Sequence, residues 1–107
     1  MSNIVVSPHY LSTNAGIEIL QNGGNAIGAA IGTNIVQGVV APETCGIGGD
    51  LFSLIWINGE STPYCLDSSG YAGSNVDISQ LSTQESIPLD HPMSVTVPGA
   101  VKGWFSM

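Results

Sequence analysis

Few side chains in this sequence could do chemistry, and their spacing matches no standard catalytic set. The two histidines, His9 and His91, lie far apart in the sequence, and no serine or cysteine stands in a recognisable nucleophile setting. Each histidine could act in catalysis, but we interpret both as surface residues. The aspartates Asp50, Asp67 and Asp90 are isolated, so they form no carboxylate pair for acid–base work. Composition and spacing alone therefore indicate no active site.

A glycine-rich segment, residues 46–49, invites a phosphate-binding interpretation. Phosphate loops run from a strand into a helix whose N-terminus holds the phosphate. Here the order is reversed, because a helical pattern precedes the glycines and an apolar strand pattern follows them. We therefore assign these glycines a structural role, in which they permit positive φ angles and close backbone contacts.

The cysteines give no sign of metal or redox chemistry. Cys45 and Cys65 form no Cys-x-x-Cys pair and have no histidine cluster nearby, which argues against a zinc site or a redox motif. We expect two buried free thiols that behave as small hydrophobic side chains. No metal is expected.

Charge excludes two classes of partner. Only 8% of the 107 residues are charged, eight acidic groups face the single basic residue Lys102, and the net charge is −7. Nucleic-acid binding and binding to anionic membranes both need several lysines or arginines, so neither is expected. The first eight residues contain no basic n-region and no long apolar stretch, so a cytoplasmic location is expected.

The helical pattern falls in the first half of the sequence. A short β-prone run at residues 4–7 precedes a helix predicted over residues 9–21, which buries a row made by Leu11, Ala15 and Ile19. Gly23 and Gly24 stop this helix, and Asn25 caps the next. The second helix, residues 26–40, is predicted as a buried central helix with one apolar row of Ile27, Ile31, Ile35 and Val39. Its two glycines, Gly28 and Gly32, would admit another backbone.

The second half predicts a hairpin and a final helix. Residues 51–57 form an apolar strand, Asn58 and Gly59 a turn, and residues 62–66 the returning strand. A short helix is predicted near residues 78–85 with Asp77 as its cap, and another begins at Ala100. The fold class is therefore α/β (α+β).

A chain of this size that is 43% apolar and only 8% charged is not expected to cover all its apolar surface by itself. We expect part of a larger assembly or an obligate oligomer. The alternative is a self-sufficient, non-catalytic binding or oligomerisation module.

Several ordered motifs resemble the N-terminal part of the large subunit of a γ-glutamyltranspeptidase (glutathione hydrolase). The resemblance is carried by residues 7–11, 15–20, 23–27, 29–30, 39–43, 46–52 and 95–104. The Gly-Gly-Asn-Ala and Gly-Ile-Gly-Gly segments are the most specific of these. The subgroup that includes acylase-like members is the most similar. Residues 1–107 are thus expected to be an N-terminal fragment of such a subunit.

The resemblance implies an incomplete N-terminal-nucleophile (Ntn) hydrolase, a four-layer αββα sandwich made by autocleavage of one precursor. In that family a newly exposed threonine attacks the γ-glutamyl amide, and its own amino group serves as base. The resemblance implies no cofactor. The implied partners are a γ-glutamyl or acyl amide substrate, the rest of the large subunit and the small subunit. The nucleophile lies beyond the matched region, so this chain alone is predicted to be inactive.

One segment departs from the family pattern. Typical members carry an arginine after the hairpin that grips the substrate carboxylate, and the aligned position here is Ser69 or, in the acylase-like pattern, Tyr71. The resemblance therefore assigns substrate binding to Ser69, Gly70 and Tyr71, with the arginine absent. Loss of a charge-assisted hydrogen bond would weaken recognition of a free carboxylate, although the small subunit could supply the missing contact.

Overall fold

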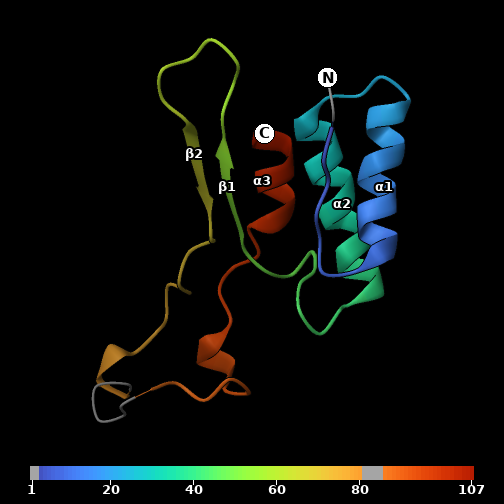
Figure 1. Ribbon diagram of the computed structural model, residues 1–107. Helices are drawn as coiled ribbons and strands as arrows, with labels where there is room; N and C mark the ends of the chain where they lie inside the picture. The colour runs from blue at the N-terminus through green and yellow to red at the C-terminus, as the bar shows by residue number, and fades with distance from the viewer. Residues whose placement is uncertain (1–2, 81–85) are drawn as a thin grey trace.

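The computed structural model describes residues 3–80 and 86–107, which form a helix pair and a β-hairpin joined by short and long loops (Figure 1). The helix pair comprises α1 (Tyr10–Gln21) and α2 (Ala26–Val40). The hairpin comprises β1 (Leu51–Ile55) and β2 (Tyr64–Ser68), and α3 (Ala100–Ser106) packs against both strands. The mixture of helix and sheet agrees with the predicted fold class.

Local capping signals set the ends of the two long helices. The Nδ1 atom of His9 accepts the backbone N–H of Leu11 at 3.2 Å, so His9 caps the start of α1. Gly23, with φ of 88°, ends this helix in the left-handed region that favours glycine. The Asn25 side chain accepts the N–H of Gly28 at 2.8 Å and caps α2. The predicted stop, cap and bounds of α2 are confirmed.

The two helices meet along small and polar residues rather than along the predicted apolar rows. The buried residues are Ser12 and Gly16 in α1 and Ala29, Thr33 and Gln37 in α2. The predicted rows are only partly buried: Leu11 is 43% exposed, Ile35 43% and Val39 76%, whereas the other members of the two rows are half-buried. Small side chains let the helices approach closely, which leaves the larger apolar side chains outside the contact.

The glycine that permits this approach is Gly16, not Gly28 or Gly32. A Cβ on Gly16 would overlap the Thr33 hydroxyl and lie 3.2 Å from the backbone oxygen of Ala29. The prediction for the two glycines of α2 was wrong, because Gly32 faces the Ile19 side chain rather than a backbone.

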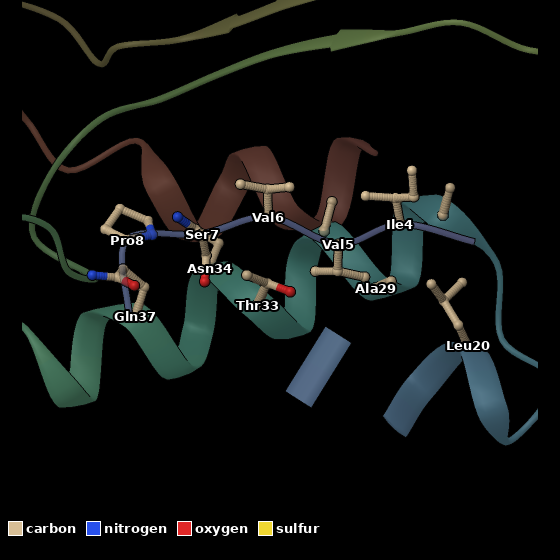
Figure 2. A pocket seen from close by; sticks show the side chains of 12 residues that line it. Ile4, Val5, Val6, Ser7, Pro8, Leu20, Ala29, Thr33, Asn34 and Gln37 are labelled. Atoms are coloured by element: carbon tan, nitrogen blue, oxygen red, sulfur yellow. The ribbon is translucent and has the colours of Figure 1, made fainter. Parts of the chain in front are cut away.

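The N-terminal segment runs lengthwise along the helix pair and does not join a sheet. Residues 4–7, predicted as a strand, have no ladder partner within the described residues. They run along α2 and enclose a cavity of about 350 Å³ with Thr33, Asn34 and Gln37 (Figure 2). The Val5 side chain reaches the contact between the helices beside Gly16. This cavity belongs to the packing of the helix pair.

The hairpin is antiparallel, with Leu51 opposite Ser68 and Ile55 opposite Tyr64. Both strands differ from their predicted bounds, because Pro63 would face Trp56 in this register and lacks the N–H that the ladder needs. The strands are therefore joined by a loop of residues 56–63. Gly59, with φ of 92°, lies in the predicted turn, and the Glu60 N–H donates to the Ile57 oxygen at 3.0 Å.

The connection between β2 and α3 is long, and its described residues contain two single 3-10 turns. These are η1 (Ile78–Gln80) and η2 (Pro92–Ser94). The helix predicted for residues 78–85 is only the turn η1 as far as the structure describes it, and residues 81–85 lie outside the described residues. The Asp77 carboxylate accepts the Ser79 N–H at 3.0 Å, as expected of a cap. The predicted helix at Ala100 is confirmed.

Little of the described chain forms an apolar core. The buried apolar residues are Ala29, Ala41, Leu51 and Ala100. Large apolar side chains on the hairpin stay exposed, including Phe52 at 68% and Leu54 at 71%. This agrees with the prediction that the chain does not cover its own apolar surface. Among the described residues, no helix has the length and apolarity needed to cross a membrane.

Candidate functional site: the cavity between β2 and α3

The segments that leave β2 and enter α3 are bonded together although thirty residues separate them in sequence. The Ser68 hydroxyl donates to the backbone oxygen of Gly99 at 2.7 Å, and this bond is buried. One step further out, the Val97 N–H donates to the Tyr71 oxygen at 2.9 Å. These two bonds hold residues 69–71 against the start of α3.

Two glycines make this contact possible. Gly70 has φ of 75°, and a Cβ there would overlap the backbone oxygen of Val97. A Cβ on Gly99 would overlap the backbone oxygen of Ser68. Glycine is therefore needed at both positions, and at Gly70 for its backbone angle as well.

A cavity of about 470 Å³ lies beside this contact. All three residues that the sequence assigned to substrate binding line it: Ser69, Gly70 and Tyr71. Ser69 and Gly70 are half-buried, whereas Tyr71 is 79% exposed. The structure thus gathers the three predicted residues around one hollow, although their contact with a substrate stays a prediction.

The same cavity is lined by Lys102, which sequence reasoning did not assign to the site. Lys102 comes from α3, and its side chain is exposed. The signal that could have found it is its charge, since it is the only basic residue among the 107. The distance along the chain hid its proximity to residues 69–71.

One carboxylate also lines the cavity. Asp67, at the end of β2, accepts the backbone N–H of Ser69 at 2.9 Å through Oδ1. This bond turns the chain sharply after the strand. Within the described residues, the ammonium of Lys102 makes no hydrogen bond or ion pair, so Asp67 does not neutralise it through direct contact.

The glycine-rich loop, residues 46–49, is hydrogen-bonded to the start of α3. The backbone oxygen of Gly49 accepts the N–H groups of Gly99 and Ala100, both at 3.0 Å. The Asp50 carboxylate accepts the Thr96 hydroxyl at 2.7 Å. The loop makes close backbone contacts, as predicted, but the expected positive φ angles were wrong, because residues 46–49 contain none.

The α2 helix is tied to the same region by a contact that the sequence did not signal. The indole N–H of Trp104 donates to the Asn34 side-chain oxygen at 2.8 Å, and the bond is partly buried. Trp104 and Asn34 also line a larger cavity of about 800 Å³, together with the exposed apolar row of α2 and the glycine-rich loop. That cavity is mostly apolar, and its polar lining residues include Asn34, Thr44, Cys45 and Asp50.

The remaining predicted candidates serve local structure. His91 caps η2, because its Nδ1 accepts the Met93 N–H at 3.1 Å. Cys45 and Cys65 are free, but the predicted burial was wrong: Cys45 is half-buried, and Cys65 is exposed because it lies on the uncovered face of β2. Over residues 3–80 and 86–107, no three potential metal ligands come together.

Comparison with known proteins identifies the family. The family model of gamma-glutamyltranspeptidase matches residues 12–107. The chain belongs to the γ-glutamyltranspeptidase family. It is 39% identical over 102 residues to the glutathione hydrolase-like proenzyme YwrD of Bacillus subtilis. This alignment covers 94% of the chain and 19% of that proenzyme. It is 38% identical over 102 residues to the oxamate amidohydrolase proenzyme of Klebsiella pneumoniae, with the same two coverages.

A solved structure of the family shows the same arrangement of elements. The γ-glutamyltranspeptidase of Helicobacter pylori superposes with a TM-score of 0.86 at 28% identity, and the match covers 100% of this chain and 32% of that chain. The expected relation to Ntn hydrolases is confirmed at the level of fold. The chain spans about a fifth of the length of the curated relatives it matches.

Proposed function

We propose that the protein carrying this segment is an amide hydrolase or acyltransferase of the γ-glutamyltranspeptidase type. It would cleave the substrate amide through an N-terminal threonine that autocleavage exposes, with the threonine's own amino group as base. The observation that carries the proposal is the family match over residues 12–107. This chain would contribute part of the scaffold and one wall of the substrate site.

We further propose that residues 69–71 form that wall. The cavity supports this assignment, because Ser69, Gly70 and Tyr71 line one hollow and are held there by backbone bonds. Ser69 and Tyr71 offer hydroxyl groups in place of a guanidinium, so recognition of a free carboxylate is weaker than an arginine would allow. Glutathione is therefore a weak substrate, or other acyl amides are preferred.

The names of the two relatives narrow the substrate class. Glutathione and oxamate differ in size, yet each combines an amide bond with a free carboxylate. An acyl amide with a carboxylate on its acyl side is accordingly the substrate class that we propose. The proposed partners are the rest of the large subunit and the small subunit, and the cytoplasmic location also stays a prediction, which cell fractionation would test.

The test is to express the full-length protein that contains this segment and follow two properties. Autocleavage should yield two subunits, the smaller of which begins with threonine by N-terminal sequencing. The processed protein should release nitroaniline from γ-glutamyl-4-nitroanilide or ammonia from oxamate. Processing without hydrolysis of either compound would contradict the proposed substrate class, and absence of processing would contradict the proposed mechanism.

A further inference from the structure

We propose that Lys102 is the cation that binds the substrate's carboxylate in this cavity. The inference rests on the proposed function and deepens it, because it names a specificity-determining residue to which the sequence analysis assigned no role. The positive charge that faces the substrate's carboxylate would then lie on α3, whereas the family's arginine lies on the segment after β2.

Charge makes Lys102 the only candidate within this chain. A carboxylate that leaves water needs a positive group or several hydrogen-bond donors. The chain has no arginine and no second lysine, and its net charge is −7. The cavity beside residues 69–71 holds the only lysine of the chain, together with the Asp67 carboxylate.

The surroundings of Lys102 leave its ammonium available. It makes no ion pair or hydrogen bond within the residues that the structure describes. The nearest competitor by position, Asp67, uses Oδ1 to accept the Ser69 N–H and so helps to shape the loop. The hydroxyl-bearing side chains of Ser69 and Tyr71 line the same hollow and can add donors to a bound carboxylate.

A lysine in this role changes specificity in a definite way. Its ammonium is a mobile point charge, whereas an arginine grips both carboxylate oxygens in a fixed fork. Lys102 therefore favours a carboxylate over a neutral group but tolerates several positions of that carboxylate. Such tolerance suits acyl groups of different length better than it suits the glutamyl group alone.

The experiment uses the full-length processed protein and two matched anilides. L-γ-Glutamyl-4-nitroanilide carries the carboxylate, and 4-aminobutyryl-4-nitroanilide is the same acyl amide without it. Lys102→Met and Lys102→Gln remove the charge, and Lys102→Arg keeps it. Ser61→Asp, in the exposed hairpin loop outside the cavity, lowers the net charge by one as the neutral variants do and serves as the control.

The two neutral variants should raise the KM for the glutamyl anilide about ten-fold or more, as expected from losing a charged hydrogen bond. The KM for the aminobutyryl anilide should stay within about two-fold, Lys102→Arg should retain carboxylate preference, and Ser61→Asp should behave as wild type. Equal changes for both anilides, or no change, would overturn the assignment. Failure of both neutral variants to fold would assign Lys102 a structural role and overturn it as well.

A binding measurement separates this inference from the proposed function. If the wild type hydrolyses neither the two anilides nor oxamate, the proposed function fails, whereas calorimetric titration with L-glutamate still decides the role of Lys102. Binding by the wild type that weakens about ten-fold in Lys102→Met supports the assignment. Absence of binding to the wild type, or equal binding to both proteins, overturns it.

Discussion

At the scale of single residues, the cavity depends on the backbone of Gly70. Its φ of 75° would cost an alanine about 1–2 kcal/mol, and the added Cβ would also overlap the Val97 oxygen. We therefore predict that Gly70→Ala in the full-length protein lowers the melting temperature and impairs any amide hydrolysis. A thermal unfolding experiment measures the first effect.

Gly48→Ala is the matched control for that prediction. Gly48 lies in the glycine-rich loop, has no positive φ, and a Cβ there would meet no atom within 4 Å of it. Its replacement should change the melting temperature much less than Gly70→Ala does. Equal effects of the two changes would show that the conformation of Gly70 does not limit stability.

At the scale of elements, the helix pair is held by a buried polar contact. Ser12 is fully buried, and its hydroxyl donates to the Gln37 side-chain oxygen at 2.8 Å. Ser12→Ala leaves that oxygen without its donor, which costs about 1–3 kcal/mol of stability. Urea unfolding of the full-length protein should show this loss, whereas Asn14→Ala on the exposed face of α1 should not.

A double variant tests the cause of that loss. Replacing both partners, as Ser12→Ala with Gln37→Leu, removes the unsatisfied oxygen and should recover much of the stability. If the double variant is as unstable as the sum of the two single variants, the hydrogen bond is not what Ser12 contributes.

Sequence reasoning succeeded where the signal is local. Asn25 and Gly23 act within one helical turn, so their capping roles follow from residue type and spacing. It misjudged the buried helix faces, because the contact forms where Gly16 has no side chain and α2 can come close, not where α1 is most hydrophobic. The end of β1 at Ile55 and the start of β2 at Tyr64 likewise depend on the position of Pro63 opposite Trp56.

The same distinction applies to the candidate site. Ser69, Gly70 and Tyr71 could be predicted because they are contiguous and depart from a family motif. Lys102 stands out in the sequence by its charge alone, but its place beside these residues depends on the bonds that join Ser68 to Gly99 and Tyr71 to Val97. No pattern in the sequence reports contacts over about thirty residues.

At the scale of the whole molecule, the exposed apolar surface predicts how the 107-residue chain behaves alone. Phe52 and Leu54 stay exposed on β1, Trp56 is exposed directly after it, and the two-stranded sheet has open edges. We predict dimers, larger species or poor solubility by size-exclusion chromatography. A monodisperse monomer with a cooperative calorimetric melt would instead favour the alternative of a self-sufficient binding module.

The isolated chain should also lack activity. The family resemblance places the nucleophilic threonine beyond the matched region, so we predict that none of the threonines of this chain attacks the amide. Purified chain should therefore release no nitroaniline from γ-glutamyl-4-nitroanilide above the background rate. Turnover that co-purifies with the chain would contradict the prediction that the nucleophile lies outside these 107 residues.

The central claim is that residues 69–71 contact the substrate's carboxylate, and restoring the missing arginine tests it most directly. In the full-length protein, Ser69→Arg and Tyr71→Arg each place a guanidinium at one of the two aligned positions on the cavity wall. At least one of them should raise kcat/KM for γ-glutamyl-4-nitroanilide about ten-fold or more over wild type, as a charged hydrogen bond allows. No gain from either folded variant would contradict the account.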